Sequence, residues 1–193
     1  MAKVAVIVAP GCEEGETLAI ADILRRSEIE CDLVGLSAQD VAGAHSIVLR
    51  ADVVFDGSLD GYDMVVLPGG YGGSDAMRDD ERLVAELRSM NERGAWVCAI
   101  CAAPMVLGRA GLLAGRRFTC YPSVVQKVEN PGTWVDEPYV VDQNLITGQG
   151  PALAYAFAYA LVDALGVDSE PVKQRMVYYN AFNVEGGVPS WQR

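Results

Sequence analysis

The sequence predicts an α/β fold: a flavodoxin-like three-layer sandwich in which helices cover both faces of a mostly parallel central sheet. Apolar runs rich in β-branched residues, typical of strands buried on both faces, alternate with segments of helical periodicity. That alternation favours parallel strands joined by right-handed crossovers. The length of 193 residues and the hydrophobic content of 51% suit one core, so we expect a single domain over residues 1–193.

The first half of the chain contains three apolar runs that predict buried strands. The first run stops at Pro10-Gly11, which turns the backbone. A helix is expected over residues 16–27, because apolar residues recur there at helical spacing and two arginines fall in the last turn. The predicted strands are residues 3–9, 31–36 and 64–70, with residues 47–55 as a strand or a hairpin arm outside the main sheet.

The second half continues the alternation. Residues 79–93 predict an amphipathic helix, because apolar residues recur at i, i+4 and i+7 among charged ones. Residues 96–100 are apolar enough for a central strand, and AAPMVLGRAGLL follows as a helix whose Pro104 is tolerated in the first turn. The later predicted elements are short strands at residues 117–120 and 144–147 and an apolar helix at residues 151–166.

Composition narrows the function classes. A net charge of −11 disfavours nucleic acid or an anionic membrane as a partner, because both require clustered Lys and Arg. No apolar run approaches the roughly 18 residues that span a bilayer, and the N-terminus lacks the features of a signal peptide, so we expect a cytoplasmic protein without membrane contact. Five cysteines, one histidine and no glycine-rich phosphate loop predict reduced thiols, no metal site and no cofactor.

Cys101 is the strongest candidate for chemistry. It follows the predicted strand 96–100 and precedes a predicted helix, so its sulfur should lie at a sharp turn near helix N–H groups. Those groups stabilise a thiolate and lower the thiol pKa, and the nucleophile elbow of hydrolases has the same geometry. The alternative is a buried, unreactive cysteine. Cys98 completes a CxxC pair, but within a strand the two Cα atoms would lie about 10 Å apart, beyond the ~7 Å limit for a disulfide.

Two further segments could serve Cys101. Gly69 and Gly70 lie after Pro68 at the end of the predicted strand 64–70 and can turn the backbone so that an N–H points at an oxyanion, although they could also simply end the strand. Glu16 lies after the first strand in a turn with two other glutamates. A carboxyl that faces a thiolate there would be partly buried and protonated, whereas spacing alone fits a solvated helix N-terminus.

The remaining candidates have simpler interpretations. His45 is the only histidine and therefore the only candidate for a Cys–His dyad, but a loop histidine is more often a solvated or interface side chain. Tyr155, Phe157 and Tyr159 fall on both sides of the last predicted helix, which favours core or dimer packing over a cofactor site.

Five segments, taken together, carry a family resemblance: VAVIVAPGCEEGET, MVVLPGGYGG, VCAICAAPMVLGRAGLL, FTCYP and ITGQGPALAYAFAYALVDAL. They resemble the ThiJ/PfpI family from about residue 3 to residue 166. The resemblance implies a flavodoxin-like sandwich and a homodimer. It further implies that Cys101 is the nucleophile, that Glu16 hydrogen-bonds it, and that the N–H groups of Gly70 and Ala102 hold the oxyanion.

The chain departs from the family pattern at three positions. Peptidase-type members carry a histidine directly after the nucleophile, whereas Ala102 stands here, so the resemblance implies no peptidase. Deglycase-type members often have a histidine in the segment that here contains Tyr121, which leaves the general acid or base open. An arginine common near the dimer interface is replaced by His45, which bears on anion binding.

The resemblance implies a cysteine-dependent enzyme, a glyoxalase of the glyoxalase III (lyase) type or a protein deglycase. Its substrate would be a methylglyoxal-type 2-oxoaldehyde or a glycated adduct, without glutathione or metal. The alternative is a non-enzymatic oxidative-stress sensor or chaperone that works through oxidation of Cys101.

Two expectations concern assembly and protonation. The homodimer would use an apolar face of the first helix, formed by Leu18, Ala21 and Leu24. Glu16 is expected to be protonated at neutral pH, and its loss to raise the pKa of Cys101, because a neutral carboxyl donates a hydrogen bond to a thiolate.

Overall fold

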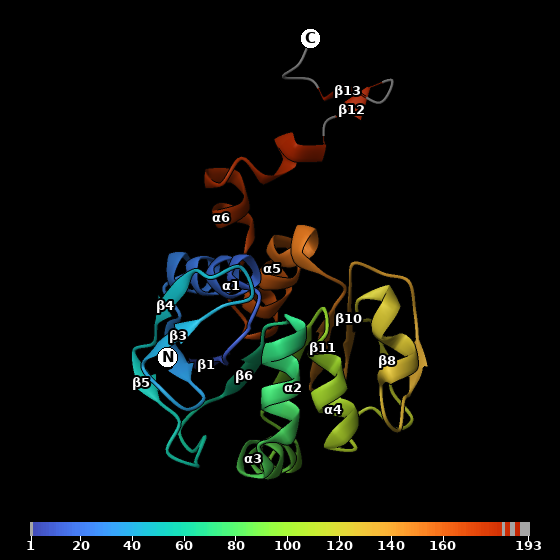
Figure 1. Ribbon diagram of the computed structural model, residues 1–193. Coiled ribbons are helices and arrows are strands. Elements are labelled where there is room, and N and C mark those ends of the chain that lie inside the picture. The colour runs from blue at the N-terminus through green and yellow to red at the C-terminus, as the bar shows by residue number, and fades with distance from the viewer. Residues whose placement is uncertain (1, 183, 186–187, 190–193) are drawn as a thin grey trace.

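A seven-stranded sheet forms the centre of the molecule (Figure 1). The computed structural model describes residues 2–182, 184–185 and 188–189. The strands of the sheet are β1 (Lys3–Val8), β2 (Glu30–Gly35), β5 (Val53–Val54), β6 (Met64–Leu67), β7 (Trp96–Ile100), β10 (Tyr139–Asp142) and β11 (Leu145–Gly148). They lie in the order β10–β11–β7–β6–β1–β2–β5, and every neighbouring pair is parallel except β10 with β11.

Helices cover both faces of this sheet. The helices of the described residues are α1 (Glu14–Arg26), α2 (Tyr71–Asp79), α3 (Glu81–Glu92), α4 (Pro104–Arg109), α5 (Ala154–Ala164) and α6 (Glu170–Arg175), with 3₁₀ turns η1 (Pro122–Lys127), η2 (Pro151–Leu153) and η3 (Tyr178–Phe182). The short helix α6 lies outside the three layers (Figure 1). The helices α1 and α5 pack together on one face, and α2, α3 and α4 pack together on the other (Figure 1). This arrangement confirms the predicted three-layer α/β fold.

Three small strand pairs lie outside the main sheet: β3 (Asp40–Ala42) with β4 (Val48–Arg50), β8 (Arg117–Phe118) with β9 (Thr133–Trp134), and β12 (Val184–Glu185) with β13 (Val188–Pro189). The expectation for residues 47–55 is therefore half right. Its first part is a hairpin arm, but Val53–Val54 joins the main sheet beside β2. Asp52 causes the change of direction, because its carboxylate accepts the N–H of Leu33 and so holds the chain against β2.

The sequence patterns missed α2, which begins directly after Gly70. The segment of α2 carries two glycines and buries only Gly73, Ser74 and Met77, which leaves no apolar stripe to detect. The expected helix over residues 79–93 begins at Glu81, because the Asp80 carboxylate accepts the N–H groups of Arg82 and Leu83 and caps α3.

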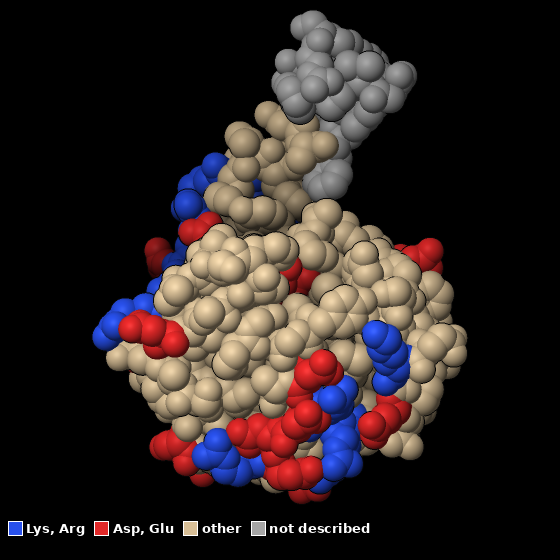
Figure 2. Space-filling model, viewed as in Figure 1, with Lys and Arg blue, Asp and Glu red and all other residues tan. Residues whose placement is uncertain are grey.

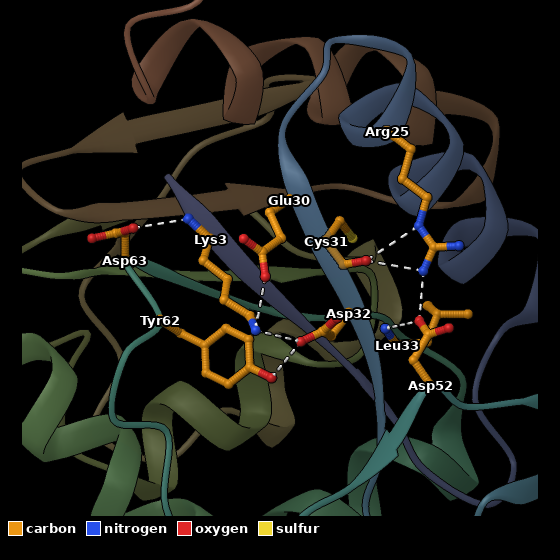
Figure 3. Close-up of polar contacts among 9 residues, drawn as sticks. All are labelled: Lys3, Arg25, Glu30, Cys31, Asp32, Leu33, Asp52, Tyr62 and Asp63. Carbon is orange, nitrogen blue, oxygen red and sulfur yellow. Dashed lines mark hydrogen bonds and ion pairs between the residues drawn. The ribbon is translucent and has the colours of Figure 1, made fainter. Parts of the chain in front are cut away.

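A network of ion pairs and hydrogen bonds joins the amino ends of β1 and β2, the edge of the sheet opposite the carboxyl ends (Figure 3). The ammonium of Lys3 lies 2.9 Å from Glu30 and 3.0 Å from Asp32, and the Tyr62 hydroxyl donates to Asp32 at 2.8 Å. On the same strand β2, the carbonyl of Cys31 accepts hydrogen bonds from the Arg25 guanidinium. These contacts fix the start of the strands.

The apolar face expected on α1 is mostly covered. Ala21 and Leu24 are buried, because α1 packs against α5 and the sheet, and only Leu18 is exposed, at 47%. The expectation that Ala21 and Leu24 lie at the surface is wrong. Helical periodicity identifies an apolar face, but it does not tell which part of the fold covers that face.

The charged side chains are unevenly distributed over the face seen in Figure 2. They gather over α3 and the end of α2, whereas the surface over the N-terminal turn of α2 is largely uncharged (Figures 1 and 2). None of the helices in the described residues combines the length and the apolar composition that a membrane crossing requires.

Candidate active site

Three adjacent strands of the sheet lead into one cluster of residues. The strands β1, β6 and β7 are neighbours, and the segments that follow their carboxyl ends carry Glu16, Gly69 with Gly70, and Cys101. In open parallel sheets, ligands bind at this edge. The structure thus brings together the four residues that the sequence places in separate loops.

The backbone of Cys101 is held in an unusual conformation between β7 and α4. Its φ of 62° lies in the left-handed region, which costs a non-glycine residue about 1 kcal/mol or more. Two neighbours hold it there: its N–H donates to the carbonyl of Gly148 at 3.0 Å, and its own carbonyl accepts the N–H of Tyr121 at 2.9 Å. The residue is 9% exposed, so it is largely shielded from water.

Glu16 is a fully buried acid whose carboxyl faces Cys101. The N–H of Gly69 donates to Glu16 Oε2 at 2.7 Å, and Oε1 has no nitrogen or oxygen partner among the described residues. Burial raises the pKa of this carboxyl to about 7, against the opposing hydrogen bonds from Gly69 and Cys101. Glu16 therefore titrates near neutral pH.

The pKa of Cys101 is raised to about 12, opposite to the lowering expected from the sequence. Burial is the largest cause, and the charge and hydrogen bonding of Glu16 add to it. The N–H groups of Gly70 and Ala102 act in the other direction, because they donate to the sulfur. The two side chains share a buried site, which accommodates one negative charge more easily than two. When Glu16 is ionised, the neutral thiol of Cys101 donates its proton toward the carboxylate.

The two glycines are required by space as well as by conformation. A Cβ at Gly69 would lie 2.6 Å from the Cβ of Cys101 and 2.8 Å from Glu16 Oε2. Gly70 has a φ of 85°, and a Cβ there would lie close to the backbone of Gly11. Gly69 also differs from its expected role: its N–H is used by Glu16, which leaves Gly70 and Ala102 as the donors to sulfur.

His45 pairs with Glu14 and not with Cys101. Its Nδ1 lies 2.9 Å from Glu14 Oε2, and its backbone N–H donates to Glu14 Oε1 at 2.7 Å. Burial opposes ionisation of Glu14, but the hydrogen bonds from His45 and nearby N–H groups lower its pKa to about 2. Ligand atoms of Glu13, Glu14 and His45 lie within 4.8 Å of one another, and the exposed imidazole is already engaged as the partner of Glu14.

The other cysteines are free and buried, and Cys98 forms no disulfide with Cys101. Tyr121 contributes its N–H to Cys101, while its ring is 41% exposed and packs beside Gly150. Tyr71 and Ser123, which sequence patterns do not single out, lie directly beyond Gly70 and Tyr121 and share a hydrogen bond. The sequence signal that could have identified Tyr71 and Ser123 is their position directly after the PGG and CYP segments.

Comparisons with known proteins identify relatives of this chain. Residues 2–164 match the DJ-1/PfpI family. Protein dj-1beta of Drosophila melanogaster is 41% identical over 186 residues, which cover 91% of this chain and 97% of that protein. Its crystal structure superposes with a TM-score of 0.87 at 38% identity, covering 92% of this chain and 98% of that chain.

Two more distant relatives extend the comparison. A protein of Pyrococcus horikoshii named a deglycase is 32% identical over 165 residues, which cover 84% of this chain and 99% of that protein. A structure of Toxoplasma gondii DJ-1, described as oxidized, has a TM-score of 0.83 at 27% identity and covers 92% of this chain and 98% of that chain. The resemblance to ThiJ/PfpI proteins is thereby confirmed, and the chain belongs to the DJ-1/PfpI family.

Proposed function

We propose that this protein is a cysteine-dependent glyoxalase or deglycase that acts on 2-oxoaldehydes such as methylglyoxal, or on their adducts, without glutathione or metal. One observation carries the proposal: the buried carboxyl of Glu16, with a pKa of about 7, faces the thiol of Cys101, and the N–H groups of Gly70 and Ala102 converge on the same sulfur. A nucleophile, a base and an oxyanion site therefore meet within one cluster.

The first step forms a hemithioacetal. The Cys101 sulfur bonds to the aldehyde carbon while the C=O π bond breaks, and the thiol proton passes to ionised Glu16 and then to the new alkoxide. A pKa near 7 suits this task, because at neutral pH the carboxyl is ionised in about half of the molecules and returns the proton readily. The N–H groups of Gly70 and Ala102 stabilise the oxygen as charge develops on it.

The second step moves a proton between two carbons of the bound substrate. Glu16 removes the proton from the aldehyde-derived carbon and delivers it to the adjacent carbon by way of an enediol, which leaves a lactoyl thioester on Cys101. Water then hydrolyses the thioester to lactate and restores the thiol. One carbon is oxidised and its neighbour reduced, so the sequence needs no external oxidant or cofactor.

Replacement of the nucleophile tests this function. Cys101→Ala should abolish the loss of methylglyoxal and the formation of lactate, because no C–S bond can form. Cys31→Ala, which removes a buried thiol at the start of β2, should retain the wild-type rate. An unchanged rate in Cys101→Ala would show that the mechanism is wrong.

A second candidate function is an oxidative-stress sensor or chaperone in which Cys101 is oxidised to sulfenic or sulfinic acid. The oxidized state of the Toxoplasma relative supports it. Intact mass after mild peroxide, measured beside turnover of the same sample, separates the two functions. Oxidation at one site without any turnover would favour the sensor, whereas turnover that falls as Cys101 is oxidised would favour the enzyme.

We also propose that the protein forms a homodimer in the cytoplasm. Support comes from the α1–β4 patch, the exposed apolar side chains of Leu18, Ile47 and Val48. These residues are neighbours, because Glu14 lies one turn before Leu18 on α1 and accepts the N–H of Ile47. Exposed apolar side chains grouped in this way are typical of interaction surfaces.

A further inference from the structure

The two segments that hold Cys101 are tied to each other by their exposed side chains. Gly70 contacts the sulfur of Cys101, and Tyr121 donates to its carbonyl. Immediately beyond these residues, the hydroxyl of Tyr71 lies 2.8 Å from Oγ of Ser123, across 52 positions of sequence. Because both segments contact Cys101, the bond between Tyr71 and Ser123 joins, at the protein surface, the two segments that hold this residue.

A cation strengthens this tie. The ammonium of Lys127 lies 4.9 Å from the centroid of the Tyr71 ring, within the range of a cation–π contact. Lys127 and Ser123 belong to the same 3₁₀ turn, η1, so both contacts join Tyr71 at the start of α2 to η1. We call this set of contacts between Tyr71, Ser123 and Lys127 the α2–η1 bridge.

We propose that the α2–η1 bridge determines substrate size: it keeps the approach to Cys101 narrow, so that free small 2-oxoaldehydes reach the thiol and adducts carried on protein side chains do not. This inference rests on the proposed function and names the substrate class within it. Cys101 is only 9% exposed, whereas Tyr71 and Tyr121, in the two segments that contact it, are 47% and 41% exposed. A molecule that approaches the sulfur between these segments would therefore meet the bridge first.

The bridge is weak enough to open, and the opening should be measurable. A neutral hydrogen bond at an exposed position shifts an equilibrium between closed and open forms by about fivefold. Loss of the bond should therefore raise access for a bulky molecule about fivefold, while access for a small molecule changes little. The ratio of the two rates is the diagnostic quantity, since a general change in the reactivity of Cys101 would alter both rates equally.

Thiol labelling measures this ratio without reference to catalysis. We would compare iodoacetamide with fluorescein maleimide and quantify modification at Cys101 by peptide mass spectrometry. The variants are Tyr71→Phe, Ser123→Ala and their combination. The matched control is Tyr62→Phe, which removes a hydroxyl that donates to Asp32 at the opposite edge of the sheet (Figure 3). Both single variants should raise the ratio of the bulky to the small rate about fivefold, the double variant no further, and the control not at all.

Turnover then connects access to substrate class. In the two single variants, removal of adducts from a methylglyoxal-treated peptide should rise relative to loss of free methylglyoxal. An unchanged labelling ratio in both variants would overturn the bridge as a size filter, as would an equal rise in Tyr62→Phe. A raised labelling ratio in a protein that consumes no 2-oxoaldehyde would retain the bridge and refute the proposed function, so the two failures can be told apart.

Discussion

At the scale of single residues, the central feature is a buried acid paired with a buried thiol. The pKa of each group rises because burial disfavours its charged form, and the charge of Glu16 raises the pKa of Cys101 further. The sequence indicated this contact and predicted a neutral Glu16 that donates to a thiolate, whereas in the structure the charge and hydrogen bonding of Glu16 raise the pKa of Cys101. A carboxyl with a pKa of about 7 is ionised in about half of the molecules at neutral pH, and the ionised form opposes the thiolate.

The first prediction concerns stability against pH in Glu16→Gln. The pKa of Glu16 rises from 4.5 when unfolded to about 7 when folded, so the folded state is favoured below pH 4.5 and loses this advantage as the pH rises through 7. One pKa unit corresponds to about 1.4 kcal/mol, so the variant should gain on the order of 2–3 kcal/mol over the wild type between pH 4.5 and 8. Urea unfolding across this range measures the difference.

Glu92→Gln, on the exposed end of α3, is the control and should follow the wild type at every pH. A difference between Glu16→Gln and the wild type that stayed constant from pH 4.5 to 8 would contradict the assigned titration.

The second prediction concerns the thiol itself. Glu16→Gln removes the charge that raises the pKa of Cys101, so the thiol pKa should fall below that of the wild type. The ultraviolet absorbance of the thiolate can be followed against pH in a background in which the other four cysteines are replaced. Glu16→Leu removes the charge and every hydrogen bond together, and a higher pKa there than in the wild type would instead favour a neutral Glu16 that donates to a thiolate.

At the scale of elements, the site depends on how closely the turn after β6 approaches the elbow after β7. Gly69 lies against both Cys101 and Glu16, so this turn acts as a spacer between the two reacting groups. A larger side chain there has no flexible neighbour to displace, because the atoms in its way belong to the nucleophile, the base and the backbone N of Ala102.

The third prediction follows from this approach. Gly69→Ala should lower methylglyoxal turnover by at least tenfold, because the added Cβ would lie 2.6 Å from the Cβ of Cys101 and force the thiol out of position. Gly72→Ala, on α2, is the matched control, since a Cβ there would meet only the backbone of Pro10 and Gly11, at ordinary contact distances of 3.4 Å or more. Equal turnover in the two variants would show that the turn can relax without moving the site.

Helices and strands that a local sequence pattern specifies were predictable. Those that form only by pairing with a segment far away in the sequence were not. The strands β1 and β7 coincide closely with their predicted ranges, because a strand buried on both faces is an unbroken apolar run. The strand β6 begins where predicted but ends at Leu67, before the Pro-Gly-Gly turn that the predicted range 64–70 included. The two residues of β5 form a strand only because β2 lies beside them. Cys101 and Glu16 could be expected close together, because they follow the carboxyl ends of β7 and β1, which both flank β6. The Tyr71–Ser123 bond joins two loop side chains that no local pattern relates, so it could not be expected.

At the scale of the whole molecule, the fold leaves the α1–β4 patch uncovered. Val48 is 62% exposed on a hairpin outside the main sheet, and Leu18 lies beside that hairpin on α1. The carboxylate of Glu14 on α1 holds the β3–β4 hairpin in place through hydrogen bonds with His45, so the patch has a defined shape. A rigid apolar surface of this kind suits contact with a second copy of the same patch about a two-fold axis.

The fourth prediction tests that assembly. The wild type should have twice the chain mass of 20.7 kDa by light scattering at micromolar concentration. Val48→Glu should shift it to 20.7 kDa, because an unpaired charge placed in an apolar contact costs several kcal/mol. Val141→Glu is the control: Val141 is exposed to a similar degree on β10, at the other edge of the sheet, and its replacement should leave the dimer intact. Circular dichroism would verify that both variants fold. A mass of 20.7 kDa for the wild type would refute the proposed dimer. A dimer that persists in Val48→Glu but dissociates in Val141→Glu would instead show that the interface lies at the opposite edge of the sheet and not at the α1–β4 patch.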